Sequence, residues 1–408
     1  MTVQAPIPRP APARWSEVLR GTPALPMILV TVAGHMMLFG MLTPVMATYA
    51  QGFGVPGWQI GLMISLFAVG RLAADLPAGV LAGRTGLRLL LWGGPALCGV
   101  GGLIGGLATE YAQVLAGRIV QGVGSGLYMT AATIYVARLS APDNRGKLMA
   151  MFQGAMLVGA SLGPVTGGWA AAALGPGGPF LAGAAIGFAT ALAAAIMARE
   201  PQAKPAPGHA HRPPLALILS LPFLSVLAVN LGVFLTRTVG QWQLLPLLAT
   251  ERFAASPGQI GLAITLSAVG TLAVLPLTAR LIERVPGVPV IAGSLLATIL
   301  CLVAIALAPS MSMLLAAMVA MGLATGVTGP AIAAYAVEIS DPEHHGPAMG
   351  ALRFAGDLGY LVGPISFGFI VDATDIGQAG GMLLNAGLVG AMVALLVLTR
   401  RRARHGFS

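Results

Sequence analysis

The sequence has little charge and almost no cysteine. Only 9% of its 408 residues are Asp, Glu, Lys or Arg, whereas a soluble domain carries roughly 25%. This scarcity argues against a soluble protein, as do a hydrophobic content of 56% and a mean hydropathy of +0.85. Cys98 and Cys301 both fall inside apolar runs, which favours packing over a disulfide or metal site. The sequence shows no nucleophile arrangement, metal-ligand cluster or phosphate loop, so we expect neither an enzyme nor a metal centre.

Long apolar runs recur along the chain. Because a helix rises about 1.5 Å per residue, a run of about 20 residues crosses a hydrocarbon core of about 30 Å. The runs cover residues 25–50, 59–82, 87–108, 111–138, 147–173, 178–197, 215–249, 257–280, 287–308, 311–338, 347–372 and 377–399. This pattern predicts an all-α polytopic membrane protein with twelve transmembrane helices in a lipid bilayer.

The chain repeats itself at an offset of 200 residues. Residues 59–70 (QIGLMISLFAVG) return as residues 259–270 (QIGLAITLSAVG), and nine of the twelve positions are identical. Gly163 and Pro164 return in the same way as Gly363 and Pro364. Two halves in the same order are typical of parallel-repeat transporters, so we expect two six-helix bundles.

Polar segments set the predicted domain boundaries. We expect an N-terminal tail (1–24), a first bundle (25–198), a Pro-rich linker (199–214), a second bundle (215–399) and a basic tail (400–408).

The positive charges predict the topology. Seventeen of the 22 lysines and arginines lie in the tails, the linker, and the even-numbered loops with their flanks, whereas the odd-numbered loops hold only Arg252. The positive-inside rule then places both termini and the linker in the cytoplasm. The net charge of +9 thus reflects topology rather than nucleic-acid binding. We expect a monomer in a bacterial inner (plasma) membrane.

Two motifs resemble those of the major facilitator superfamily. After the second span, Gly79, Arg84, Gly86 and Arg88 match the superfamily's loop motif G-x-L-A-D-R-x-G-R-K/R, although Gly83 replaces the acid and Leu87 replaces an arginine. In the fourth span, the sequence RIVQGVG, which starts at Arg118, is similar to the superfamily's second motif.

A third motif narrows the resemblance to twelve-span drug and metabolite exporters. Their antiporter motif is matched in the fifth span by Gly159, Gly163, Pro164, Gly167 and Gly168. Glycines at i, i+4 and i+8 form a smooth helix face that lets a neighbouring helix approach closely. The resemblance covers nearly the whole chain and implies a transporter that works by alternating access.

Charges inside the predicted spans are functional candidates, because a charge in hydrocarbon must face a cavity or a partner. They are Arg71, Asp75, Arg118, Arg237, Arg353 and Asp357, with His35 as a further titratable residue. The positions opposite the six charges in the repeat hold Thr271, Leu275, Met318, Met37, Gln153 and Leu157. The shared scaffold therefore does not require these charges.

Two pairings of these charges are possible. Arg71 and Asp75 are four residues apart, as are Arg353 and Asp357, so each pair can form locally. The estimated depths are about 9 Å for Arg353, about 12 Å for Asp75, about 15 Å for Asp357 and about 18 Å for Arg71. In the superfamily these two helices face each other, so Arg353 can instead pair with Asp75, and Arg71 with Asp357. Such crossed pairs would close the inner side of the cavity in the outward-open state.

We therefore expect proton-coupled efflux (antiport) of small organic molecules, with the proton gradient in place of a cofactor. Asp75 and Asp357 would carry protons, with His35 as the next candidate, and Arg71 and Arg353 would be their gate partners. The substrate cavity would be lined by Arg118, Arg237, Gln121 and Gln241. The alternative is a proton-coupled or exchange importer that binds an anionic metabolite through the surplus of arginines. A receptor without transport activity would have no need for unsymmetric buried charges.

Overall fold

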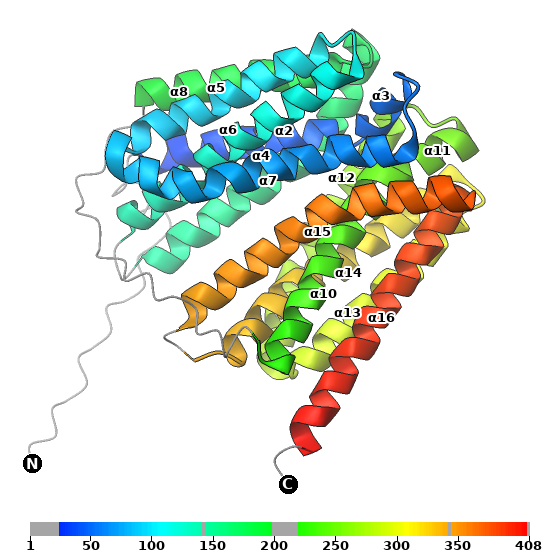
Figure 1. Ribbon diagram of the computed structural model, residues 1–408. Coiled ribbons are helices and arrows are strands. Elements are labelled where there is room, and N and C mark those ends of the chain that lie inside the picture. Colours follow the sequence, from blue (N-terminus) through cyan, green and yellow to red (C-terminus); the bar gives the residue numbers. More distant parts are fainter. Residues whose placement is uncertain (1–23, 141–143, 198–218, 342–343, 406–408) are drawn as a thin grey trace, which may run out of the picture.

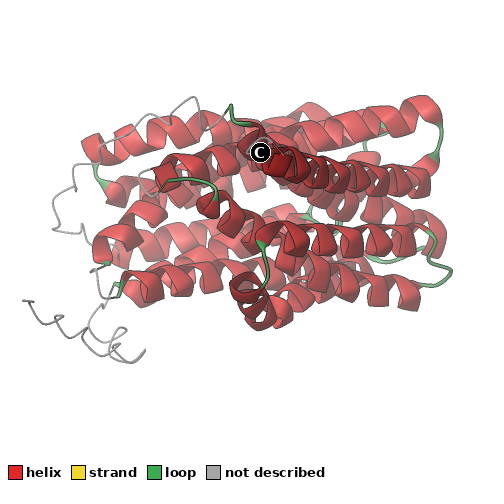
Figure 2. Ribbon diagram, turned by 90° about the horizontal axis from the view of Figure 1, so that it is seen from below, coloured by secondary structure: helices red, strands yellow, loops and turns green. Residues whose placement is uncertain are grey.

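The computed structural model describes residues 24–140, 144–197, 219–341 and 344–405 (Figure 1). Every regular element in these ranges is a helix (Figure 2). The first half contains α2 (Leu25–Leu42), α3 (Met46–Gln51), α4 (Gly57–Thr85), α5 (Leu87–Gly106), α6 (Tyr111–Leu139), α7 (Arg145–Leu174) and α8 (Gly178–Met197). The second half contains α10 (Leu221–Arg237), the π-helical segment η1 (Thr238–Leu244), α11 (Leu245–Phe253), α12 (Pro257–Arg284), α13 (Gly287–Ala306), α14 (Met311–Glu338), α15 (His345–Thr374) and α16 (Gly377–His405). The predicted linker lies outside the described residues, as does the N-terminal tail up to residue 23.

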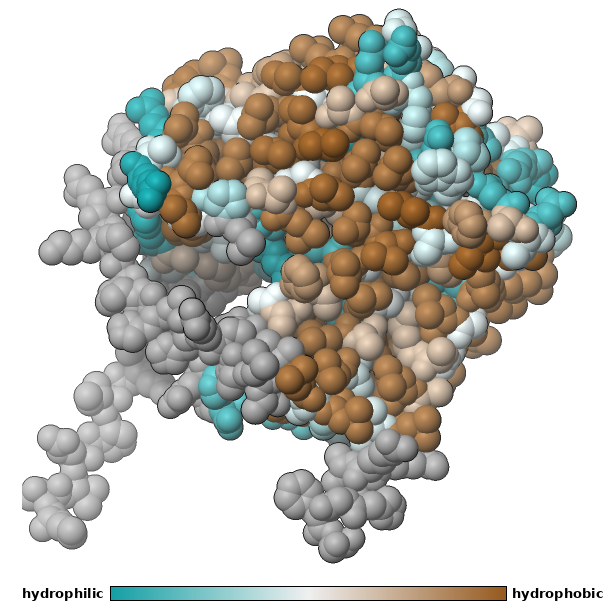
Figure 3. All heavy atoms as spheres, viewed as in Figure 1, coloured by the Kyte–Doolittle hydropathy of each residue, from teal (hydrophilic) through white to brown (hydrophobic). Residues whose placement is uncertain are grey.

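The predicted all-α membrane fold is confirmed. Eleven spans are long and apolar enough to cross a membrane, and α6, which is 29 residues long and carries Arg118 and Gln121, completes the predicted twelve. Figure 3 shows hydrophobic residues over most of one face, with hydrophilic residues gathered toward its two ends and in a patch where the bundles meet.

Three predicted spans differ in detail from the observed helices. The first is broken between α2 and α3 at residues 43–45, where Pro44 cannot donate a backbone hydrogen bond. The seventh contains the π-helical turn η1 and continues to Phe253. The last helix continues through the basic residues to His405, beyond the predicted end at residue 399.

The two bundles contact each other mainly through two pairs of helices. α4 packs against α15, and α7 packs against α12. Figure 1 shows the bundles closest to each other where α3, α11 and the end of α15 meet.

Glycines allow this close contact at one end of the molecule. A side-chain carbon added to Gly57 would lie 2.6 Å from Asp372 Oδ1, and one added to Gly168 would lie 2.5 Å from the Pro257 carbonyl oxygen. Gly61 meets the backbone of Pro364 in the same way. We call this region, defined by these six residues, the packed end.

The halves separate toward the opposite end. Carbons added to Gly79 and Gly83 of α4, Gly154 of α7 or Gly350 of α15 would meet nothing within 4 Å. We call the region around these four glycines the open end. The same two helix pairs are therefore in backbone contact at one end and apart at the other.

The glycine face predicted in the fifth span packs within its own half. Carbons added to Gly159, Gly163 or Gly167 of α7 would run into the backbone of α2. At Gly163 the nearest atom would be the Cα of Gly40, 2.5 Å away. Gly168 points instead to α12, and the Pro164 carbonyl faces Gly261 of that helix. This motif therefore serves packing within the first half and contact between the halves.

Candidate functional site

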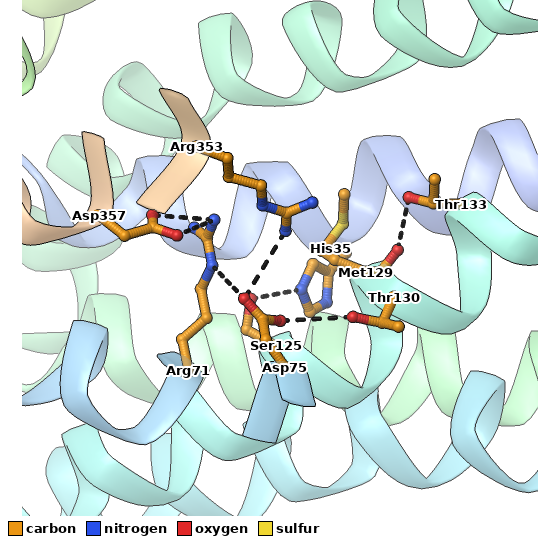
Figure 4. A network of polar contacts seen from close by, with 9 residues as sticks. All are labelled: His35, Arg71, Asp75, Ser125, Met129, Thr130, Thr133, Arg353 and Asp357. Carbon is orange, nitrogen blue, oxygen red and sulfur yellow. Dashed lines mark hydrogen bonds and ion pairs between the residues drawn. The ribbon is translucent and has the colours of Figure 1, made fainter. Parts of the chain in front are cut away.

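Four charges from both halves meet between α4 and α15 (Figure 4). Arg71 Nη2 lies 3.1 Å from Asp357 Oδ1, and Arg353 Nη2 lies 3.8 Å from Asp75 Oδ2. Both crossed contacts expected from the estimated depths are thus present. Arg71 Nε also lies 3.9 Å from Asp75 Oδ2 on its own helix. We call these four residues the charge cluster.

The expected local contact between Arg353 and Asp357 is not among the ion pairs of the described residues. Asp75 has two arginines nearby and also accepts a hydrogen bond from Thr130 Oγ1 at 3.4 Å. Within the described residues, the ion pair of Asp357 is with Arg71, through both carboxylate oxygens. Asp357 therefore depends on contact between the halves for its ion pair, whereas Asp75 also has partners within its own half.

The charge cluster lies where the two halves begin to separate. On its packed side, Ser65 of α4 donates a hydrogen bond to the Leu361 carbonyl of α15. On its open side, Gly79 and Gly350 have no neighbour. On α15 the exposure of the side chains rises toward the open end, from 9% for Asp357 to 48% for Arg353. The cluster was expected to close the inner side of an outward-open state, but here the crossed contacts occur while one end is already open.

Arg118 is held inside the first half and carries no ion pair within the described residues. It is 1% exposed, its Nε donates to the Met63 carbonyl at 3.2 Å, and its Nη1 donates to Gln121 Oε1 at 2.9 Å. Its guanidinium lies 4.7 Å from the centre of the Phe67 ring. These neutral partners fix its direction and leave its positive charge uncompensated.

Arg237 ends α10 and is exposed although it sits in the interior of the second half. Its guanidinium lies 5.9 Å from the Trp242 ring, and it is within electrostatic range of Tyr360 on α15. Tyr360 is also within range of Arg118 and Arg71 of the first half. Since a charged side chain does not face lipid, this exposure indicates a solvent-accessible space between the halves.

Gln241, predicted to line the cavity, lies in η1 and is mostly buried, with its Nε2 at 3.5 Å from Ser267 Oγ. The wide turn of η1 is stabilised by Asn385 of α16, which accepts a bond from Thr236 Oγ1 and donates to the Thr236 carbonyl. π-Helical turns often occur at functional sites. The turn brings Trp242 to within 5.0 Å of the Tyr360 ring.

His35 lies apart from these contacts, in the core of the first half. It is 1% exposed, its Nε2 lies 3.2 Å from Ser125 Oγ, and its ring packs against Phe39 and Tyr128. Among the described residues, no hydrogen bond or ion pair joins it to the charge cluster. Its surroundings are those of a packed core histidine.

The loop motif shapes the connection at the open end. Gly86 has φ 82°, which a residue with a side chain rarely adopts, and it links α4 directly to α5. Arg88 donates from Nη2 to the Ala195 carbonyl of α8 at 2.7 Å. Arg84 is exposed. Gly79 and Gly83, as described above, face open space.

Two features of the site were missed in the sequence. The aromatic residues Phe67, Trp242 and Tyr360 meet between the halves, with Phe67 and Tyr360 centred 6.2 Å apart. The sequence signal that could have identified them is that the equivalent positions of the repeat hold no aromatic residue. The second is Asp372 near the end of α15, which accepts a hydrogen bond from the Trp58 backbone N–H at 3.0 Å. It thereby caps α4 from the other half.

Comparison with known proteins agrees with this architecture. The family model of the Major Facilitator Superfamily matches residues 28–243 and 227–408. The MFS-type transporter MJ1560 of Methanocaldococcus jannaschii is 23% identical over 355 residues, 86% of this chain and 91% of the relative. The quinolone resistance protein NorA of Staphylococcus aureus is 22% identical over 364 residues, 88% of this chain and 92% of the relative.

Solved structures share the fold at low identity. A bacterial homolog of the human lysosomal transporter Spinster, in an inward-facing and occupied conformation, superposes with a TM-score of 0.78 at 16% identity and covers 92% of this chain and 96% of its own. The nucleoside transporter NupG gives a TM-score of 0.77 at 14% identity over 92% and 98% of the two chains. With the family model matching nearly the whole sequence, the chain belongs to the major facilitator superfamily of membrane transporters.

Proposed function

We propose that this chain is a secondary active transporter that exports small organic molecules in exchange for protons by alternating access. The observation that carries this proposal is the charge cluster. The two acids deep in the bundle are Asp75 and Asp357, and each contacts an arginine of the opposite half at the point where the halves separate. The similarity to the quinolone resistance protein NorA supports export.

The charge cluster would couple protonation to movement of the halves. While Asp75 and Asp357 are ionised, their contacts with Arg353 and Arg71 hold α4 and α15 together. A protonated carboxyl loses most of its attraction to a guanidinium, whereas the arginines stay charged. Proton uptake therefore weakens the tie and favours rocking of the halves to the opposite arrangement.

The predicted topology relates this cycle to the two sides of the membrane. The surplus of positive residues near the linker puts the open end in the cytoplasm under the positive-inside rule. The arrangement seen here then corresponds to a state that opens to the cytoplasm after proton release. Ionised aspartates would hold the empty carrier in this state until substrate binds.

Asp357 is the stronger candidate for the transported proton. When the halves part, Asp75 keeps Arg71 of its own helix and Thr130, whereas Asp357 loses its contact with Arg71. A carboxyl that loses its cationic partner in a desolvated place binds a proton more readily. Asp75 would then act mainly in holding the closed arrangement.

A second function is favoured by Arg118 and Arg237, which have no carboxylate partner among the described residues. Two uncompensated cations suit an anionic substrate, which the chain would import with protons or by exchange. The human organic anion transporter MFSD10 shares the fold, with a TM-score of 0.64 at 20% identity. In export by exchange the protons move opposite to the substrate, whereas in proton-coupled import they move with it.

Proton flux in liposomes tests the proposal. Purified protein is reconstituted with a pH-sensitive dye in the lumen, and cationic, neutral and anionic compounds are added outside. Export by exchange predicts that entry of a transported compound moves protons outward and makes the lumen more alkaline, whereas import with protons acidifies it. We expect Asp357→Asn to abolish this flux and the exposed control Glu283→Gln to retain it. Substrate flux of normal size without any proton movement would contradict the proposal.

A further inference from the structure

We propose that the compounds carried by this protein are aromatic anions. Their anionic group would contact the exposed Arg237 within the field of the buried Arg118, and their ring would lie against Phe67, Trp242 and Tyr360. This inference rests on the proposed transport function, but it concerns only what the site binds. It requires neither a direction of transport nor a coupled proton.

The first observation is the balance of charge between the halves. The charge cluster holds two arginines and two aspartates, so it is neutral as a unit. Arg118 and Arg237 add two positive charges in the same region, since each lies beside an aromatic ring, Phe67 or Trp242, that is next to Tyr360. Buried charge without compensation is costly, and a bound anion would supply the missing compensation.

The second observation is the way in which Arg118 is held. Its Nε and Nη1 bind neutral acceptors, the Met63 carbonyl and the Gln121 side chain, and its face lies on Phe67. These contacts fix the guanidinium without neutralising it. A cation whose direction is set before binding loses little freedom when an anion arrives.

The third observation is the exposure of Arg237. This residue lies at the junction of α10 and η1, in the middle of a span that runs from Leu221 to Phe253. Its side chain is nevertheless exposed, and it lies beside Trp242 and near Tyr360. An exposed cation at this depth is accessible to a solute that enters from the open end.

Aromatic rings connect the two cations. Arg118 lies on Phe67, Phe67 and Tyr360 are centred 6.2 Å apart, Tyr360 and Trp242 are 5.0 Å apart, and Arg237 lies by Trp242. Such ring distances are those of edge and offset contacts that a planar apolar ligand can join. The ligand would therefore carry both a negative group and a flat apolar body.

The duplication separates these residues from the scaffold. In the repeat, the positions opposite Phe67, Trp242, Tyr360, Arg118 and Arg237 hold Ser267, Leu42, Ala160, Met318 and Met37. No aromatic or cationic member of the set is repeated. The equivalent positions of the other half therefore lack these side chains, and the shared scaffold does not account for them.

Binding of three matched compounds tests the inference. Radiolabelled 2-naphthoate, 2-naphthamide and 2-naphthylmethylammonium share one ring system and differ in charge. Equilibrium dialysis with the purified protein at one pH needs no gradient, so its outcome is independent of proton coupling. We expect the carboxylate to bind at least about tenfold more tightly than the amide and the ammonium.

Variants then locate the anion. Arg237→Gln is decisive, because this exposed residue is easily replaced, and we expect it to weaken carboxylate binding about tenfold while amide binding stays constant. Arg118→Gln should act in the same direction, and Trp242→Ala should weaken both ligands equally. The exposed Arg284→Gln is the matched control and should change neither. Tightest binding of the ammonium, a carboxylate preference that survives Arg237→Gln and Arg118→Gln, or failure of all three compounds to bind would each overturn the proposal.

Absence of proton flux in liposomes, with naphthoate binding intact, would instead count against the proposed coupling alone.

Discussion

Arg71 contacts two aspartates, one on its own helix and one in the opposite half. This double contact makes the pairing testable by exchanging charges. Exchange of Arg71 with Asp357 leaves two acids on α4 and two arginines on α15, so crossed contacts stay attractive and local ones become repulsive. Exchange of Arg71 with Asp75 keeps the local pair but sets like charges against each other across the halves.

We expect the crossed exchange, Arg71→Asp with Asp357→Arg, to recover part of the thermal stability lost in either single variant. The local exchange, Arg71→Asp with Asp75→Arg, should recover none. A charge-assisted hydrogen bond is worth about 1.5–3 kcal/mol, which is large enough for the melting temperature in detergent to resolve. Greater recovery in the local exchange would show that the crossed contacts do not stabilise this arrangement.

The crossed pairs could be predicted because helix direction and rise per residue give the relative heights of the charges, and because the resemblance to the superfamily implies that these two helices face each other. The three-way contact was not, because it depends on the reach of one flexible arginine side chain. The aromatic residues around Tyr360 were also missed. In an apolar sequence, a tyrosine that faces the space between the halves looks the same as one in the core.

At the scale of single helices, the contact of α7 with α2 depends on backbone approach. A carbon at Gly163 would lie 2.5 Å from the Gly40 Cα, so no side-chain movement can relieve the clash. We expect Gly163→Leu to abolish transport while the protein still inserts. Gly154→Leu on the same helix is the control for stability, because nothing lies within 4 Å of that position in this arrangement, so it should keep the melting temperature that Gly163→Leu lowers. Normal transport by Gly163→Leu would show that α2 can move away at no cost.

The N-terminus of α4 is capped differently from that of α12, its counterpart in the second half. In α12, Ser256 caps its own helix and Gln259 completes the capping box. In α4 the corresponding residue is Pro56, which makes no cap, and Asp372 of α15 accepts the Trp58 N–H instead. The first half thus depends on the second for a helix cap that is worth about 0.5–2 kcal/mol.

We expect Asp372→Ala to speed hydrogen exchange in the first turn of α4, while the first turn of α12 serves as an internal control and stays unchanged. Adding Pro56→Ser should restore protection, because Gln59 already stands where a capping box requires it. The added serine should not restore contact between the halves. Equal exchange in Asp372→Ala and the wild type would show that water caps this end equally well.

The existence and order of the helices followed from the apolar runs and the repeat. The break at Pro44 did not, because prolines such as Pro77, Pro95 and Pro164 also lie inside continuous helices of this chain. The π-helical turn η1 was not predicted either. In η1 the extra width is stabilised by Asn385, which is about 150 residues away along the chain. A pattern of neighbouring residues gives no information about a partner so far away along the chain.

For the molecule as a whole, topology is the first prediction. The positive-inside rule places the packed end outside the cell and the open end in the cytoplasm. A cysteine at Thr374, next to the packed end, should react with an impermeant reagent only from outside. One at Thr85, at the end of α4, should react only from the cytoplasm. The reverse pattern would invert the proposed direction of every transport step.

The central claim is that protonation of the charge cluster releases the halves from the arrangement seen here. Gly83 and Gly350 face open space on α4 and α15, so they can carry spin labels without disturbing contacts. The labels are placed on cysteines in a protein whose buried Cys98 and Cys301 are replaced by alanine.

The decisive measurement is the distribution of distances between these two labels as a function of pH, in nanodiscs, for the wild type and for Asp75→Asn with Asp357→Asn. Acid removes the carboxylate charges, so it should shift the wild type from the long distance of the open end to a shorter one. The double variant should show the same distribution at every pH. An unchanged wild-type distribution, or an equal pH response in the double variant, would contradict the account.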